Sequence, residues 1–87
     1  MPDFTVEVPL KLYTTTECHL CEEAETLLRA AQQLNSAVRW DRVDVADDEE
    51  LFNRYGWLIP VVRHDSGAEL RWPFDGALLA EFLAVNE

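Results

Sequence analysis

Two cysteines, Cys18 and Cys21, stand where the pattern of a strand gives way to that of a helix, and this junction constrains the fold more than any other feature. Before it, apolar residues alternate at Val8, Leu10 and Leu12, as in a β-strand. After it, apolar residues recur at three- and four-residue spacing on one face of an amphipathic helix: Leu20, Cys21, Ala24, Leu27, Leu28, Ala31 and Leu34. Because a three-residue step on a helix leaves two side chains on one face, the two sulfurs lie within reach of a disulfide. The spacing therefore predicts reversible oxidation of the pair.

The rest of the chain continues this alternation of strands and helices. We expect a second strand over 38–45 and then a short helix to about Tyr55, with Asp47 as its N-cap and Glu50 as the capping-box partner. A β-hairpin over 60–72 follows, with Gly67 in its turn. Asp75 caps a last helix, whose apolar face consists of Leu78, Leu79, Phe82 and Leu83. The order β-α-β-α-β-β-α predicts an α/β fold with a mixed four-stranded sheet, strands in the spatial order 2-1-3-4, and helices on both faces. No linker or repeat interrupts residues 1–87, so we expect one domain.

Acidic residues outnumber basic ones, 17 Asp and Glu against 7 Lys and Arg, which gives a formal net charge of -10. Phosphates bind clusters of Lys and Arg, so this composition argues against nucleic acid and against an anionic membrane surface as partners. No apolar run approaches the roughly 20 residues that span a bilayer. Residues 1–10 contain two acids and no base, unlike a secretory signal. We expect a monomeric, cytoplasmic protein.

The positions of the two cysteines on the helix predict different roles for them. Cys18 precedes the first helical turn, where unpaired N–H groups and the positive end of the helix dipole favour a thiolate, so we assign it as the nucleophile. Cys21 falls on the apolar face one turn further on, and we assign it as the buried resolving thiol. Two neighbours modulate the pair: Glu17 repels the thiolate, and His19 helps it only when protonated. Each of these two is equally compatible with a simple solvated position.

Two stretches carry a resemblance to a known family: Leu12-Tyr13-Thr14-Thr15-Thr16-Glu17-Cys18-His19-Leu20-Cys21 and Tyr55-Gly56-Trp57-Leu58-Ile59-Pro60-Val61. They resemble the thioredoxin superfamily and, within it, the small glutaredoxin-like proteins that are often labelled only as a domain of unknown function. The resemblance implies a thioredoxin-like fold and a thiol-disulfide oxidoreductase that works through a mixed disulfide. It also implies that Pro60 begins the third strand after a cis Ile59–Pro60 bond and faces the cysteine pair.

The resemblance further implies what the protein binds. No metal or organic cofactor is expected. Glutathione or another thiol would serve as reductant, and the partner would be a disulfide-containing protein or a small thiol. Tyr13, Ile59 and Asp75 are candidate substrate contacts. Trp57, three residues before Pro60, could line a substrate groove or simply pack the loop.

Other interpretations compete with a redox enzyme. Cys18, His19, Cys21 and His64 could supply zinc ligands, but the two histidines lack the usual finger spacing. The six acids in residues 41–50 lack the glycine and the ligand register of a calcium-binding loop. We therefore predict no metal site. The alternative function from another class is a noncatalytic thioredoxin-fold module for interaction or redox sensing.

Overall fold

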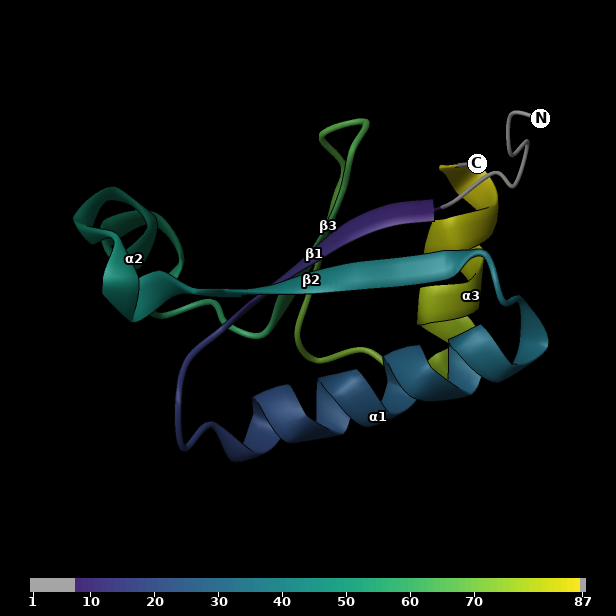
Figure 1. Cartoon of the computed structure of the whole chain (residues 1–87), viewed down its shortest axis with the longest axis horizontal. Helices are drawn as coiled ribbons and strands as arrows, with labels where there is room; N and C mark the ends of the chain where they lie inside the picture. Colours follow the sequence, from purple (N-terminus) through teal and green to yellow (C-terminus); the bar gives the residue numbers. More distant parts are fainter. Residues whose placement is uncertain (1–7, 87) are drawn as a thin grey trace, which may run out of the picture.

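The central sheet of the computed structural model, which describes residues 8–86, has its strands in the order β2-β1-β3-β4 (Figure 1). β2 runs parallel to β1, whereas β3 is antiparallel to β1 and β4 is antiparallel to β3. The strands are β1 (Val8–Thr14), β2 (Val38–Asp44), β3 (Val61–His64) and β4 (Glu69–Arg71). The predicted α/β architecture and strand order are confirmed.

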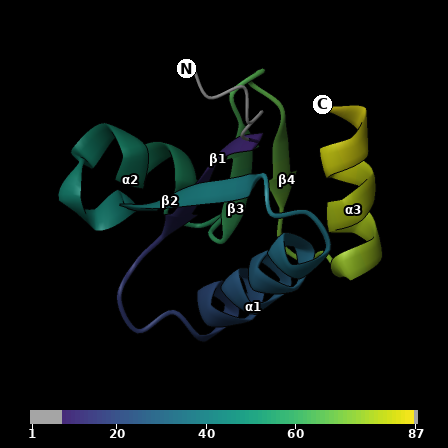
Figure 2. The same ribbon diagram turned by 45° about the vertical axis from the view of Figure 1, so that its right-hand side comes forward.

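The helices pack on both faces of this sheet. They are α1 (His19–Leu34), the short 3-10 helix η1 (Val45–Asp47), α2 (Glu49–Tyr55) and α3 (Gly76–Val85). Figure 2 shows α1 and α3 together on one side of the strands and α2 on the other. Within residues 8–86, no helix has the length and apolar character needed to cross a membrane.

Because side chains along a strand point alternately to the two faces of the sheet, a hydrophobic core forms on each face. The first core lies under α1 and α3 and contains Leu10, Leu12, Ala24, Leu28, Val38, Val62, Phe74 and Leu79. The second core lies under α2 and contains Tyr13, Val45, Tyr55 and Val61. Because neighbouring residues of a strand point to opposite faces, Leu12 and Tyr13 belong to different cores.

The apolar faces of the helices are narrower than their sequence pattern predicts. The buried line of α1 runs through Cys21, Ala24, Glu25 and Leu28. Leu20 and Leu34, which the spacing placed on the apolar face, are exposed, and so is Leu78 of α3. Leu20 lies in the first turn of α1, and Leu34 is the last residue of the helix. Residues at a helix end have fewer neighbours from the sheet to cover them.

The N-cap predicted for the second helix is wrong by one residue. Asp48, rather than Asp47, caps α2, since its carboxylate accepts hydrogen bonds from the N–H groups of Glu50 and Leu51. Asp47 instead ends η1, which is itself capped by Asp44. The acidic run thus contains two caps in succession, and the extra short helix shifts the start of α2.

The pairing of β1 with β3 decides which residues meet at one edge of the sheet. Tyr13 pairs with Val61. Pro60 therefore lies beside the end of β1, the edge from which the chain continues to Cys18. At the opposite end of β3, Gly67 has a φ of +98° in the turn to β4, a conformation that favours glycine.

Candidate functional site

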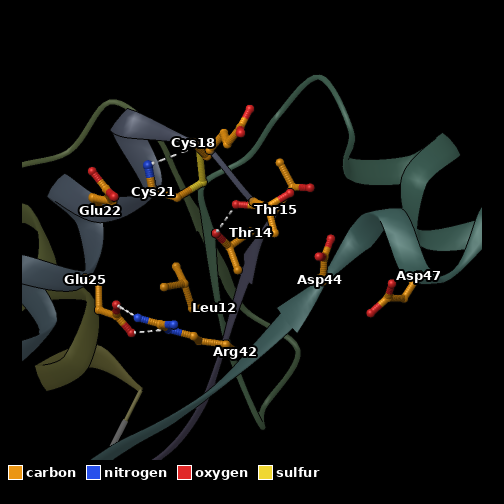
Figure 3. A pocket seen from close by; sticks show the side chains of 12 residues that line it. Leu12, Thr14, Thr15, Cys18, Cys21, Glu22, Glu25, Arg42, Asp44 and Asp47 are labelled. Carbon is orange, nitrogen blue, oxygen red and sulfur yellow. Dashed lines mark hydrogen bonds and ion pairs between the residues drawn. A yellow bond between two sulfur atoms is a disulfide. The ribbon is translucent and has the colours of Figure 1, made fainter.

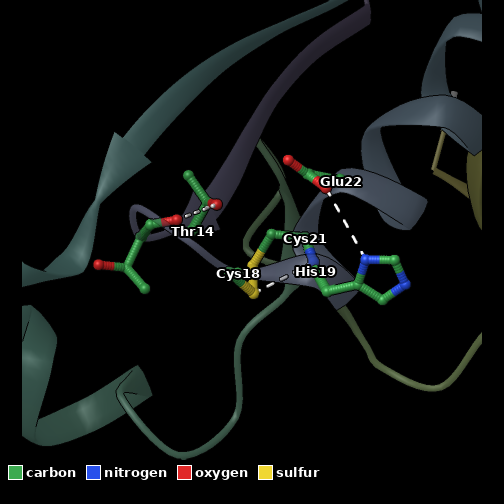
Figure 4. The surroundings of a disulfide bond; sticks show 6 residues. Thr14, Cys18, His19, Cys21 and Glu22 are labelled. Carbon is green, nitrogen blue, oxygen red and sulfur yellow. Dashed lines mark hydrogen bonds and ion pairs between the residues drawn. A yellow bond between two sulfur atoms is a disulfide. The ribbon is translucent and has the colours of Figure 1, made fainter.

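The chain passes from β1 into α1 through a loop of residues 15–18, and the last of them, Cys18, stands at the helix N-terminus. In this loop Glu17 has a φ of 58°, in the left-handed region that residues other than glycine seldom adopt. Cys18 is the N-cap residue of α1, and its sulfur accepts a hydrogen bond of 3.1 Å from the N–H of Cys21 (Figure 4). This N–H and the positive end of the helix both favour negative charge on the sulfur.

Cys18 and Cys21 are joined by a disulfide, with their Cα atoms 5.2 Å apart. Cys18 is half-buried, whereas Cys21 is only 4 % exposed and lies on the buried line of α1. The sequence places Cys21 on the buried face of the helix and Cys18 at its start, and the two residues have this order of exposure in the oxidised form. A substrate approaching from solvent would reach Cys18 first.

A cavity of about 380 Å³ opens beside the disulfide (Figure 3). It is formed by the end of β1 and the loop after it, the first two turns of α1, and the end of β2 with η1. Both cysteines line it. Its charged lining consists of Glu17, Glu22, Glu25, Arg42, Asp44 and Asp47. The cavity is therefore acidic as well as adjacent to the sulfurs.

A buried carboxylate network forms the floor of this cavity. Glu25, only 7 % exposed, accepts hydrogen bonds from two nitrogens of the Arg42 guanidinium, from the indole N–H of Trp40 at 3.1 Å and from Arg29 at 3.1 Å. The hydrogen bonds from Arg42 lower the pKa of Glu25 from its ordinary value of 4.5 to about 2, against the opposing effect of burial. Glu25 is thus a fixed negative charge and a poor proton acceptor at neutral pH.

Sequence reasoning missed this network, although a signal for it was present. Glu25 stands four residues after Cys21, so both occupy one face of the helix. A charged residue on that face needs a partner that donates hydrogen bonds to it. Arg42 lies two residues after Trp40 on β2, so both side chains point to the same face of the sheet and toward α1, as the structure shows. The pattern therefore contained an acid and a base on facing surfaces.

Pro60 lies at the sheet edge next to the cysteine loop. The Ile59–Pro60 peptide bond is cis, as the resemblance implies, and Trp72–Pro73, for which we made no prediction, is cis as well. Pro60 is buried, and its carbonyl accepts a hydrogen bond of 3.1 Å from the N–H of Trp72. Pro60 does not line the cavity beside the disulfide.

Of the two residues predicted to modulate the cysteines, the structure brings only Glu17 to the cavity. The ring of His19 points away from the sulfurs, with its Nδ1 3.8 Å from a carboxylate oxygen of Glu22 (Figure 4). His19 is 83 % exposed at its side chain. It therefore occupies the solvated position that the sequence left open.

The four candidate substrate contacts lie outside this cavity. Tyr13 is buried, and its ring stacks on that of Tyr55 at a centroid distance of 4.3 Å. Ile59 packs against the second core. Asp75 caps α3 by accepting a hydrogen bond of 2.8 Å from the N–H of Leu78. Trp57 is 95 % exposed and so does not pack the loop.

The residues weighed as zinc ligands come from two separate parts of the chain, the start of α1 and β3. Within the part of the chain that the structure describes, no three His, Cys, Asp or Glu side chains are grouped so that they could hold a metal ion. His64 lies on β3, where its Nδ1 accepts a hydrogen bond of 2.9 Å from the N–H of Ser66.

Comparison with known proteins places this fold and cysteine pair in a family. A family model described as a glutaredoxin-like domain (DUF836) matches residues 9–84. The chain belongs to this glutaredoxin-like family. A structural genomics target from X. campestris, protein XcR50, is 37 % identical, with a TM-score of 0.81 over 90 % of this chain and 99 % of that one.

Two further solved structures are similar to this glutaredoxin-like protein in fold. Protein Ne2328 from Nitrosomonas europaea is 24 % identical, with a TM-score of 0.76 over 94 % of this chain and 98 % of that one. Fasciola hepatica thioredoxin is 21 % identical, with a TM-score of 0.61 over 94 % of this chain and 83 % of that one. At these identities the likeness shows the thioredoxin fold alone. No curated protein matches the sequence.

Proposed function

We propose that this glutaredoxin-like protein is a thiol-disulfide oxidoreductase that cycles Cys18 and Cys21 between dithiol and disulfide. The observation that carries the proposal is the unequal placement of the two sulfurs. Cys18 caps the N-terminus of α1 beside an open cavity, and Cys21 is buried directly behind it. A nucleophile needs a stabilised thiolate that substrate can reach, and a resolving thiol needs only to reach the first sulfur.

The chemistry runs in two exchange steps. The Cys18 thiolate attacks one sulfur of a substrate disulfide, forming a mixed disulfide and releasing the first substrate thiolate, which takes a proton from water. Cys21, as thiolate, then attacks the Cys18 sulfur and releases the second substrate thiolate. Two electrons pass from the protein to the substrate, and the product is the Cys18–Cys21 disulfide seen in the structure.

The proposal needs no metal or organic cofactor. A thiol such as glutathione, or a protein dithiol, returns the pair to the reduced state, and the reducing cytoplasm supplies such thiols. The substrate is a disulfide-containing protein or a small disulfide, and the protein acts as a monomer of one domain. The exposed Trp57, in the loop before the buried Pro60, offers apolar surface on which such a substrate could lie.

Two serine variants test the roles of the cysteines. Cys18→Ser should abolish the reaction of the reduced protein with a small disulfide at neutral pH. Cys21→Ser should still attack but should accumulate the mixed disulfide, which mass spectrometry detects as an adduct. Formation of the adduct through Cys21 in the Cys18→Ser protein would contradict the assignment. Oxidation that occurs once and never cycles with a thiol reductant would indicate a redox-sensing module instead of an enzyme.

A further inference from the structure

The cavity beside the disulfide has an uneven charge balance. Five carboxylates line it, and the guanidinium of Arg42 is the single cation among its lining residues. Arg42 points into the floor, where two of its nitrogens are bound to Glu25 (Figure 3). Arg29 binds Glu25 as well, so the charge of Glu25 is fully compensated, and the remaining negative charge of the lining is that of the other four carboxylates.

These four carboxylates line the same cavity as the sulfurs and come from four segments of the chain. Glu17 is in the loop before Cys18, Glu22 is in the first turn of α1, and Asp44 and Asp47 are at the end of β2 and in η1. Among the ion pairs of residues 8–86, none joins Glu17, Asp44 or Asp47 to a cation, and Glu22 faces only His19. A substrate that enters this cavity to reach the disulfide therefore meets a lining with an excess of negative charge.

We infer that this site selects disulfides flanked by cationic groups, such as the ammonium of an amine or the side chains of Lys and Arg next to a cysteine. This inference rests on the proposed redox function and specifies its substrate class. A cation near the reacting sulfur gains favourable interactions with the carboxylates during approach, and an anion is repelled. Oxidised glutathione carries more carboxylates than ammonium groups, so the same lining disfavours it as substrate.

Three small disulfides of similar size provide the test: cystamine, which is cationic, hydroxyethyl disulfide, which is neutral, and dithiodipropionate, which is anionic. The reduced protein is mixed with each, and the rate of thiol oxidation is followed at low ionic strength. The measured quantity is the ratio of the cystamine rate to the dithiodipropionate rate. Since these disulfides differ in intrinsic reactivity, each ratio is compared between variants and never taken alone.

Two double variants with the same change in net charge separate a local from a global effect. Asp44→Asn with Asp47→Asn removes two carboxylates of the cavity, and the amide oxygen at position 44 can still accept the N–H of Ala46. The control, Asp65→Asn with Glu81→Gln, removes two exposed carboxylates that do not line this cavity. We expect the rate ratio to fall about tenfold in the cavity variant and less than twofold in the control. Raising the salt concentration to about 0.5 M should also reduce the ratio of the parent protein.

A peptide arm distinguishes a protein source of the cation from a small-molecule source. Disulfide-linked peptides with Lys on both sides of the cysteine are compared with peptides that carry Glu there. A larger discrimination with peptides than with the small probes would indicate a basic protein segment as the substrate, and a smaller one would indicate a small amine disulfide.

Failure of this inference is distinct from failure of the proposed function. Equal falls of the ratio in both double variants, or no fall in either, would overturn the substrate class and leave redox activity intact. Absence of reaction with all three disulfides, or equal reaction by Cys18→Ser, would overturn the redox function and the substrate class with it.

Discussion

On each face of the sheet a buried helix side chain is hydrogen-bonded to side chains of the strands: the charged Glu25 under α1 and the neutral Tyr55 under α2. Under α1, Glu25 is held by Trp40 and Arg42 of β2. Hydrogen bonds from Arg42 keep its pKa near 2, so it is ionised at neutral pH. Its charge is balanced by Arg42 and Arg29, so the network itself adds no uncompensated negative charge to the cavity beside the cysteine pair.

Under α2, the corresponding side chain is a neutral phenol. The hydroxyl of Tyr55 donates a hydrogen bond to Glu69 of β4 and accepts one of 3.3 Å from Arg63 of β3. Burial, reinforced by the hydrogen bond to Glu69, raises the pKa of Tyr55 above its ordinary value of 10. This face therefore ties its helix through a neutral hydroxyl to the half-buried Arg63–Glu69 ion pair, and it lies away from the sulfurs.

The difference predicts opposite responses to pH. The pKa of Glu25 is lower in the folded than in the unfolded chain, so its contribution to stability is present above about pH 4.5 and is lost as the pH falls toward 2. The pKa of Tyr55 is higher in the folded chain, so its contribution is lost as the pH rises above 10. The charged network thus makes the redox face acid-sensitive, and the phenol makes the other face alkali-sensitive.

The largest effect should come from removing the ring of Tyr55. Tyr55 is 2 % exposed and stacks on Tyr13, so Tyr55→Ala should lower the free energy of unfolding by about 4 kcal/mol, the usual cost of deleting a buried aromatic ring. Urea unfolding at pH 7 measures it. Tyr55→Phe is the matched control and should lose only about 1 kcal/mol, the value of the hydroxyl's hydrogen bonds. Similar losses in both variants would show that the hydrogen bonds, not packing, hold α2.

Glu25→Gln should have the next largest effect, and it should depend on pH. It replaces a charged acceptor by a neutral one, so we expect a loss of about 2 kcal/mol at pH 7, in the range measured for hydrogen bonds to charged groups. The difference from the parent protein should shrink between pH 4.5 and pH 3, where the unfolded carboxyl takes up its proton. Urea unfolding at several pH values measures both.

Glu23→Gln provides a matched control for this substitution. Glu23 is on the same helix but exposed, and the change should alter stability by less than about 0.5 kcal/mol at any pH. If the loss in Glu25→Gln stayed constant down to pH 3, shape rather than charge would explain the network. The comparison between the two faces would then lose its electrostatic basis.

The fold could be predicted from the sequence because its signals are local. The alternating residues around Leu12, the helical spacing after Cys21 and the turn at Gly67 each depend on neighbours in the chain, and the structure bears them out. The start of α2 was misplaced because Asp44, Asp47 and Asp48 are all plausible caps. In the structure Asp44 caps η1 and Asp48 caps α2, and Val45 of η1 packs into the second core.

The candidate site could be predicted only in part. Spacing along one helix was enough to pair Cys18 with Cys21. The cavity depends on contacts between residues 15 to 17 positions apart, such as those of Glu25 with Trp40 and Arg42, which no local pattern encodes. In the sequence the acidic lining appears only as an excess of Asp and Glu over Lys and Arg. The parallel pairing of β1 with β2 brings some of these acidic residues to the cavity that the two cysteines line.

The smallest predicted effect separates the two arginines that contact Glu25. Arg42 binds it through two nitrogens from β2, whereas Arg29 makes a single contact of 3.1 Å from the next turn of α1. Arg42→Met should therefore raise the pKa of Glu25 well above 2, toward 4.5, and Arg29→Met should raise it only slightly. Both changes remove one positive charge, so each is the control for the other in an NMR titration of the Glu25 carboxyl. Equal shifts in the two variants would mean that charge alone, and not the paired geometry of Arg42, keeps Glu25 ionised below the disulfide.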